Sequence, residues 1–419
     1  MKKTMVLLVG LGLSASTYAT TIKKDVLNHY ADLAYIMYED SLISAKSMQQ
    51  AIDKLIEAPT DNNLAVAREA WKQARVPYQQ TEAYRFGNAI VDDWEGKVNA
   101  WPLDEGLIDY VSSVYGSESD ENPYYAANII ANKKLQLSGK TIDTSVINKA
   151  LLADTLHELD EIESNVATGY HAIEFLLWGQ DLNGTGPGAG NRPASDFNTK
   201  QCTNGNCDRR AAFLKALGEH LIDELEWITA QWNKDGPARL ELLNSGEDKG
   251  LGTIFTGMGS LAYGELAGER IKLGLMLHDP EEEHDCFSDN THWSHYYDAQ
   301  SIKNVYTGKY TRLDGSQVSG PSLSDLVASK DSGIDKELKM RMENMMASMQ
   351  VLVDSAEKDN IAYDQLISEG NKAGNQKIMD VVNALLDTTK GIEKAIATLN
   401  LQEVAFEGSD SLDAPEKVQ

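Results

Sequence analysis

Apolar residues recur at helical spacing along most of this chain, and alternating strand-like runs are nearly absent. From Ile22 to Ile56 they fall three or four residues apart, which predicts one long amphipathic helix. A second predicted helix runs from about Asn62 to Gly87, and Pro77 within it predicts a kink. Further helices are expected at about 143–178, 208–233, 249–278, 331–367 and 374–399. The pattern therefore predicts an all-α protein made of helical bundles.

The order of these parts is repeated along the chain. In each half, two helices precede a connector rich in Asp and aromatic residues, a Val-Tyr pair followed closely by glycine, and then more helices. Such repetition predicts two similar bundles with a cleft between them. We place the N-terminal bundle at 20–205, with a Gly-rich insert at 179–207, and the C-terminal bundle at 206–405. Residues 406–419 are polar, which predicts a disordered tail.

Residues 1–19 have the pattern of a secretory signal peptide. Lys2 and Lys3 precede an apolar run, and the small residues Thr17 and Ala19 predict cleavage after Ala19. No cysteine follows the apolar run where a lipid anchor would need one, and no later segment reaches the length of a membrane span. We therefore expect an exported protein, which would be periplasmic in a Gram-negative cell.

The chain is strongly acidic, with 64 Asp and Glu against 38 Lys and Arg and a formal net charge of −26. Such a surface repels phosphate backbones and anionic lipids, which argues against nucleic-acid and membrane-surface roles. Cations or basic ligands fit this charge better. The alternative is that the charge only keeps an exported protein soluble.

Three cysteines in an oxidising compartment leave one unpaired. Cys202 and Cys207 flank TNGN, a sequence suited to a tight turn, so these two are the expected disulfide. Cys286 would then stay free and buried. A bridge from Cys286 to either of the other two is the alternative that the sequence leaves open.

The stretch GYHAIEFLLWGQD holds the main candidate for metal binding. His171 and Glu174 are three residues apart, so on a helix both side chains could reach one ion. The spacing alone is weak, because six of the eight histidines have an acidic residue three positions later. The apolar surroundings single out His171, since a buried histidine beside a carboxylate must be ligated or paired. The alternative is a core hydrogen bond between the two side chains.

The Gly-x-His-x-x-Glu pattern in GYHAIE resembles the motif of the imelysin family, which includes an insulin-cleaving membrane protease. Further stretches are similar to the iron-regulated protein A branch of that family: NAWPLDEGLIDY, GTGPGAGNRPASDF, CTNGNCDRRAAFL, GSLAYGELAGERI and EEEHDCFSDNTH. The resemblance implies two four-helix bundles related by an internal pseudo-repeat. It also implies a cell-envelope protein of iron acquisition or homeostasis, with other envelope iron-uptake proteins as partners. Its site would lie near the domain interface and include His171 and Glu174.

A metallopeptidase needs about three protein ligands, an open coordination position and a nearby base. His171 and Glu174 supply two ligands at most, and the chain contains no HExxH motif. Further ligands must come from other segments, and the candidates are Glu82, Asp104, Glu265, Glu269, Asp289 and His292. The alternatives are an ion pair for Glu269 and capping or turn roles for Asp289 and His292. A set of carboxylates with one or two imidazoles favours a ferric or divalent iron ion, and zinc also fits.

We therefore expect an exported two-bundle protein that binds a metal ion or an iron-bearing ligand at the interface of the bundles. The first alternative is a zinc-type peptidase that uses His171 as a ligand and Glu174 as a ligand or base. The second alternative is an envelope interaction protein with a degenerate site. Three outcomes would separate these functions. Bound metal would support the metal-binding protein, EDTA-sensitive cleavage of a denatured substrate would support the peptidase, and neither result would support the interaction protein.

Overall fold

The computed structural model describes residues 7–120, 122–137, 139–402 and 404–418. The predicted signal peptide at 1–19 begins outside the described residues, and side chains are described only from residue 23 onward, so cleavage after Ala19 stays a prediction. Within the described part of the chain, no helix combines the length and the apolar character needed to cross a membrane.

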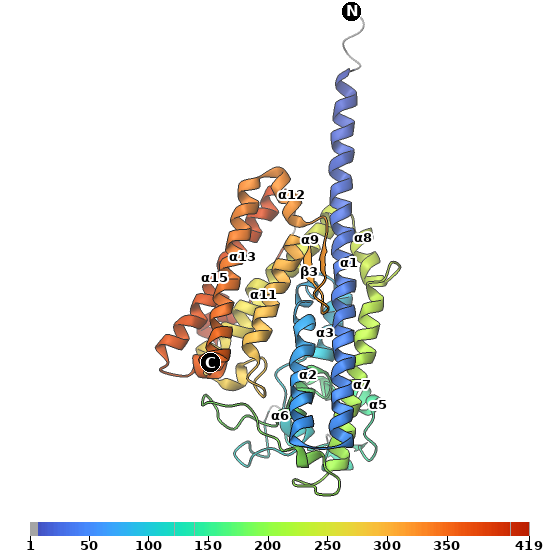
Figure 1. The fold of residues 1–419 in the computed structure, drawn as a ribbon, viewed down its shortest axis with the longest axis vertical. Helices are drawn as coiled ribbons and strands as arrows, with labels where there is room; N and C mark the ends of the chain where they lie inside the picture. The colour runs from blue at the N-terminus through green and yellow to red at the C-terminus, as the bar shows by residue number, and fades with distance from the viewer. Residues whose placement is uncertain (1–6, 121, 138, 403, 419) are drawn as a thin grey trace, which may run out of the picture.

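A first group of helices surrounds the N-terminal part of the core. It contains α1 (Leu7–Glu57), α2 (Asp61–Gln79), α6 (Gly169–Trp178) and α7 (Cys207–Gln231). α1 packs along both α2 and α7, and α6 packs against the same two helices (Figure 1). The apolar stripe expected on α1 is buried, including Leu33, Met37, Met48 and Ile52. Burial of this stripe stabilises the group, because apolar area removed from water contributes about 25 cal/mol per Å².

A second group forms the C-terminal part of the molecule. α9 (Glu247–Ser260), the π-helical segment η5 (Leu261–Lys272) and α10 (Leu273–Leu277) follow one another directly. α9 and η5 pack with α11 (Thr291–Thr307) and α15 (Lys372–Thr398). α13 (Ser332–Glu357) packs against α11 and α15, and it lies beside α15 in Figure 1. α11 also packs against α2 of the first group, so the two groups share an interface. The predicted all-α fold is confirmed.

Short elements connect the long helices. The shorter helices are α3 (Ala89–Asn99), α4 (Glu105–Ile108), α5 (Lys149–Leu151), α8 (Pro237–Asn244), α12 (Leu323–Lys330), α14 (Tyr363–Ile367) and α16 (Asp410–Asp413). The single turns are η1 (Glu82–Tyr84), η2 (Leu152–Leu156), η3 (Leu159–Glu161), η4 (Ala194–Phe197), η6 (Pro280–Glu282) and η7 (Pro415–Lys417). Two antiparallel hairpins pair β1 (Lys134–Leu137) with β2 (Lys140–Asp143), and β3 (Lys309–Thr311) with β4 (Gln317–Ser319).

Three of the predicted helices end earlier or start later than expected. The helix predicted from Asn62 ends at Gln79, two residues after Pro77, because proline removes a backbone donor and clashes with the preceding turn. The helix predicted at 331–367 breaks after Glu357. At 143–178 only α6 is a long regular helix, and Glu158, Asp160 and Glu161 before it have positive φ values. The acidic side chains of this stretch are solvent-exposed, and only Leu159 and Ile162 pack against the core there.

The helix expected to open the C-terminal bundle, α7, packs with the first group instead. Arg209 and Arg210 at its start hold it to the first half of the chain. Arg209 Nε donates to the carbonyl of Ile130 at 2.7 Å, and Arg210 Nε donates to Asp109 Oδ2 at 2.6 Å. The Gly-rich insert before α7 therefore lies between elements of the first group, whereas the predicted boundary at residue 205 assigns α7 to the C-terminal bundle.

The tail is ordered by contact with a row of glycines on α9 and η5. A Cβ atom at Gly259 would lie 2.1 Å from the Phe406 ring, and one at Gly268 would lie 2.3 Å from Ser409. Ser411 is buried, and its Oγ donates to the carbonyl of Gly268 at 3.0 Å. The structure therefore differs from the predicted disordered tail at described residues 406–418, because the glycine surface that receives them is not evident from the tail's own sequence.

We expect Gly268→Val to release this tail and to lower the free energy of unfolding by about 1–3 kcal/mol, the usual cost of overpacking. Hydrogen exchange of the tail amides and urea unfolding would measure both effects. Gly252→Ala is the matched control, since a Cβ there makes only an ordinary 3.5 Å contact with Val404. Unchanged exchange in Gly268→Val would contradict this account of the tail.

Candidate metal centre

Glycine begins the helix that carries His171. Gly169 is the first residue of α6 and has φ of +86°, a conformation that side-chain-bearing residues rarely adopt. A Cβ at this position would lie 2.5 Å from the carbonyl oxygen of Val98 on α3. The glycine of the GYHAIE motif therefore lets α6 start in contact with α3, and this contact places His171 in the interior.

The loop between η6 and α11 brings a second histidine to the same place. Asp285 in this loop donates its backbone N–H to Thr291 Oγ1 at 2.9 Å. Its carboxylate Oδ2 accepts hydrogen bonds from Asn290 Nδ2 at 3.0 Å and from the Ser294 hydroxyl. These bonds tie the loop to the first turns of α11 and fix the position of Asp285 and of His284 before it.

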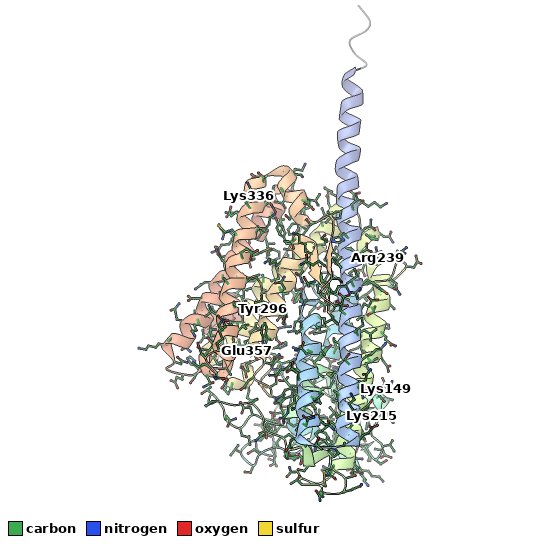
Figure 2. All side chains as sticks on the ribbon, in the orientation of Figure 1. Lys149, Lys215, Arg239, Tyr296, Lys336 and Glu357 are labelled. Atoms are coloured by element: carbon green, nitrogen blue, oxygen red, sulfur yellow. A yellow bond between two sulfur atoms is a disulfide. The ribbon has the colours of Figure 1, made fainter. Side chains whose placement is uncertain are left out.

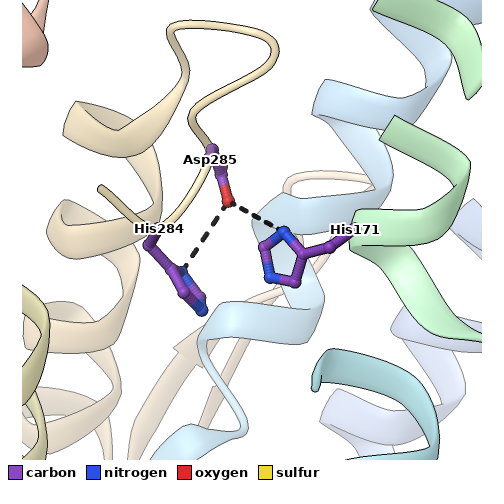
Figure 3. A group of neighbouring side chains, drawn as sticks. All are labelled: His171, His284 and Asp285. Carbon is purple, nitrogen blue, oxygen red and sulfur yellow. Dashed lines mark ion pairs between the residues drawn. The ribbon is translucent and has the colours of Figure 1, made fainter. Parts of the chain in front are cut away.

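His171, His284 and Asp285 form a buried cluster at the interface of the two helix groups (Figure 3). Asp285 Oδ1 lies 3.7 Å from His284 Nδ1 and 4.0 Å from His171 Nδ1, and the two imidazole centroids are 4.7 Å apart. One donor atom from each of the three residues lies within 4.8 Å of the others. Two imidazoles and one carboxylate are therefore close enough to share one metal ion.

Arg75 of α2 reaches this cluster from the first group. Its Nη2 donates to Asp285 Oδ1 at 3.0 Å and lies 3.4 Å from His284 Nδ1, while Nη1 donates to Asn99 Oδ1 at 2.6 Å. Because a guanidinium has no acceptor atom, His284 Nδ1 must be unprotonated in this contact. A carboxylate has about four acceptor sites, so Asp285 keeps room for a further partner.

Glu174 supports His171 from within the same helix. Its Oε2 lies 3.0 Å from His171 Nδ1, and its Oε1 accepts from the backbone N–H and the hydroxyl of Ser288, at 3.0 and 2.7 Å. Both carboxylate oxygens are thus engaged, and the hydrogen bond considered as an alternative to ligation is present. Within the described residues, His171 Nε2 is buried and has no hydrogen-bond partner. This free nitrogen is an atom that a metal could take.

Burial sets the charge states of the cluster. Burial, followed by Arg75, holds the pKa of His171 well below its usual value, and burial followed by Arg270 does the same for His284. Both imidazoles are therefore neutral, which is the form that binds metals. Burial raises the pKa of Asp285, but Arg75 and the other partners outweigh it, so the pKa is lowered and the carboxylate is ionised. Burial, and then Asp285, raise the pKa of Glu174 well above its usual value.

A pocket of about 420 Å³ leads to this cluster. Its lining includes His284, Asn99, Trp101, Arg270 and Glu269. The lining of the pocket therefore includes one member of the cluster and carries charges of both signs.

The further ligands expected from the sequence lie elsewhere. Glu82 and Glu265 both accept hydrogen bonds from Arg270, at 2.7 and 2.8 Å, and Glu269 lines the pocket. Asp104 accepts from Asn122 and Ser164, and His292 Nε2 lies 3.2 Å from Glu357, which Figure 2 labels on α13. Asp289 belongs to a separate group with Glu283 and Asp364. The structure therefore brings none of these six into the His171 cluster.

Sequence reasoning missed His284, Asp285 and Arg75. Helical spacing predicts an acid three residues after a ligating histidine, and His284 has Phe287 at that position. Its acidic neighbour is instead the next residue, in a loop where helical spacing does not apply. The resemblance of EEEHDCFSDNTH to the family is the signal in the sequence that points to this loop.

The predicted disulfide between Cys202 and Cys207 is present, and Cys286 is free and buried. The bridge closes the turn just before α7. Cys286 lines a different pocket, together with Trp101 and Glu105, and takes no part in the His171 cluster.

Comparisons with known proteins agree with this fold. Residues 34–391 match the imelysin family model, which carries a peptidase designation. Iron-regulated protein A from Synechococcus elongatus is 38% identical over 71 residues, which are 17% of this chain and span only 20% of that relative.

Two solved structures have the same fold. One is described as an iron-regulated protein A precursor from Parabacteroides distasonis, with a TM-score of 0.65 and 18% identity over 91% of this chain and 95% of that one. The other is an imelysin-like protein from Psychrobacter arcticum, with a TM-score of 0.61 and 16% identity over 92% and 98%. The family match covers well over half of the 419 residues. The chain therefore belongs to the imelysin family.

Proposed function

We propose that this protein binds an iron ion at His171, His284 and Asp285 and serves iron acquisition or homeostasis in the cell envelope. One observation carries the proposal. Two neutral imidazoles and one carboxylate converge in the interior, and within the described residues His171 Nε2 has no hydrogen-bond partner. An unpaired buried polar atom costs about 1–3 kcal/mol, which a bound metal would remove.

The donor set fits the chemistry of iron. Two histidines and one carboxylate with open positions are the ligands typical of non-haem iron(II) sites, and zinc accepts similar donors. The relative from Synechococcus elongatus is named for its regulation by iron, which favours iron over zinc. Water would complete the coordination from the side of the pocket, whose lining includes His284.

Glu174 acts on His171 rather than on the metal in this proposal. A cation bound nearby would favour the ionised form of Glu174 against the burial that raises its pKa. The ionised carboxylate would accept the Nδ1–H of His171 and leave the lone pair on Nε2 free for the ion. Its own oxygens are held by His171 and Ser288. The pair expected to supply two ligands therefore supplies one ligand and one positioning residue.

The proposed envelope location agrees with the disulfide, since such bonds persist in oxidising compartments. A protein of this kind would pass iron to, or receive it from, other envelope iron-uptake proteins. The zinc-type peptidase receives less support, because a hydrolytic base needs a free oxygen beside the metal-bound water and both Glu174 oxygens are engaged. EDTA-sensitive cleavage of denatured insulin by the purified protein would favour the peptidase.

We expect His171→Ala and Glu174→Gln each to weaken iron(II) binding at least tenfold, about 1.4 kcal/mol, in anaerobic calorimetry. Removal of a ligand, or of the group that orients it, accounts for the loss. His220→Ala is the matched control, since His220 also lies on a helix with an acid three residues later, but outside this cluster.

Circular dichroism would confirm that each variant keeps its helix content. Parental iron binding in both site variants would contradict the proposal. Unfolding of His171→Ala would instead favour a purely structural hydrogen bond with Glu174, since the change strands a buried carboxylate.

A further inference from the structure

A second group of acids lies at the two ends of the loop that carries His284 and Asp285. Glu283 stands directly before His284, Asp289 lies near the end of the loop, and Asp364 belongs to α14. One carboxylate oxygen of each of the three lies within 4.8 Å of the other two. Residues far apart in the sequence thus present three carboxylates to one point.

Most oxygens of these carboxylates are buried and have no hydrogen-bond partner among the described residues. Glu283 and Asp364 are each only 1% exposed, and neither oxygen of either side chain has a hydrogen-bond partner among the described residues. Asp289 Oδ1 is also buried and unpaired. In the described part of the chain, no ion pair at 4 Å or less involves any of the three. Neighbouring acids in a protein interior are normally hydrogen-bonded, paired or bound to a cation, so this arrangement requires an explanation.

Asp289 and Asp364 keep negative charge at neutral pH. Burial, and then Asp289, raise the pKa of Asp364 to about 7, and burial followed by Asp181 raises the pKa of Asp289 to about 6. Both carboxyl groups therefore titrate near neutral pH and are not fully neutralised by protonation there. The positive charge of Lys72 on α2 lowers the pKa of Asp289 in part. Lys72 is half-buried, and within the described residues it forms no ion pair at 4 Å or less.

We propose that Glu283, Asp289 and Asp364 bind a hard divalent cation such as Ca²⁺, at a site separate from the iron centre. Donors that are all oxygen suit Ca²⁺, Mg²⁺ or Mn²⁺ rather than a soft metal. Ca²⁺ takes six to eight oxygens in flexible geometry, so water and carbonyl groups would complete the shell. Mg²⁺ demands a closer octahedral fit, which makes Ca²⁺ the better match for three side chains from two separate segments.

The cation would hold two segments together beside a third. It would join the ends of the 283–289 loop to α14, and Asp181 of the Gly-rich insert contributes negative charge to both Asp289 and Asp364. The insert already contacts these segments, since Gly190 N donates to Phe287 O at 2.9 Å and Thr185 Oγ1 donates to Ser368 Oγ at 3.2 Å. A cation here would therefore stabilise the loop that positions His284 and Asp285.

The test compares the full chain in 1 mM Ca²⁺ with the full chain in EDTA. We expect Ca²⁺ to raise the melting temperature by at least about 3 °C. Tb³⁺, a luminescent substitute for Ca²⁺, should emit when aromatic residues are excited, because Tyr363 adjoins Asp364. Glu283→Gln and Asp364→Asn should abolish both effects, since each keeps the side-chain shape and removes one charge.

Two controls separate this site from other causes. Glu118→Gln removes an exposed acid and should respond to Ca²⁺ like the parent protein. His171→Ala should also keep the Ca²⁺ effect, which shows that the cation does not use the iron centre. Equal melting temperatures of the parent in Ca²⁺ and EDTA, or a parental response in both Glu283→Gln and Asp364→Asn, would overturn the proposal.

Discussion

Replacing Arg270 by methionine is expected to lower the free energy of unfolding by about 3–5 kcal/mol, the cost typical of leaving a buried charge uncompensated. The Arg270 guanidinium donates to Glu82, Glu265 and Asp298 at 2.7, 2.8 and 3.0 Å. These acids belong to η1, η5 and α11, so one side chain links both helix groups. Methionine fills a similar volume but leaves three carboxylates without their cation.

Urea unfolding at pH 7 would measure this loss. Lys46→Met is the matched control, because the Lys46–Glu226 ion pair is exposed on both sides and removing it should change stability by less than about 1 kcal/mol. If Arg270→Met lowered the free energy of unfolding no more than Lys46→Met does, the three acids would not be held by this arginine.

Replacing Arg75 by methionine is expected to destabilise the metal-free protein by a similar amount, about 3–5 kcal/mol, and iron should restore much of that loss. Arg75 is 1% exposed and supplies the positive charge that faces Asp285 Oδ1. A metal ion at the same oxygen would supply that charge instead. The Arg75 guanidinium and the metal ion therefore compete for Asp285 Oδ1. Removing the guanidinium should increase the stabilisation that bound iron gives.

Thermal unfolding with and without iron(II), under anaerobic conditions, would measure this effect. Arg210→Met is the matched control, because Arg210 is also buried and donates to Asp109 through Nε and Nη2, at 2.6 and 2.9 Å, far from the proposed ligands. Both variants should lose stability, but only Arg75→Met should recover it with iron. Equal iron responses in the two variants would contradict a metal site at Asp285.

The long helices could be predicted because their apolar stripes are local. Residues such as Met37 and Ile52 on α1, or Ile378 and Leu385 on α15, repeat at the period of a helix and are all buried. The predicted helix at 143–178 is wrong because the backbone leaves helical geometry at Glu158, Asp160 and Glu161, which a pattern of apolar positions does not reveal. The disulfide was also predictable from local sequence, because its two cysteines are five positions apart on either side of a turn.

The site was only half predictable. His171 and its partner Glu174 share one turn of helix, and their apolar neighbours marked them as buried. His284, Asp285 and Arg75 come from a loop and from α2, and only tertiary packing brings them to His171. The acids around Glu283 depend on the same kind of contact, since Asp364 lies on α14. No periodicity along the chain connects these positions.

X-ray diffraction from iron-soaked crystals, recorded on both sides of the iron absorption edge, tests the central claim most directly. We predict one anomalous peak within bonding distance of His171, His284 and Asp285, about 2.0–2.2 Å from each donor atom by analogy with zinc–nitrogen and zinc–oxygen bonds. The peak should disappear in crystals of His171→Ala that keep the same fold. A fully soaked crystal with no peak among these three residues, or with its only peak elsewhere, would contradict the iron centre proposed for this protein.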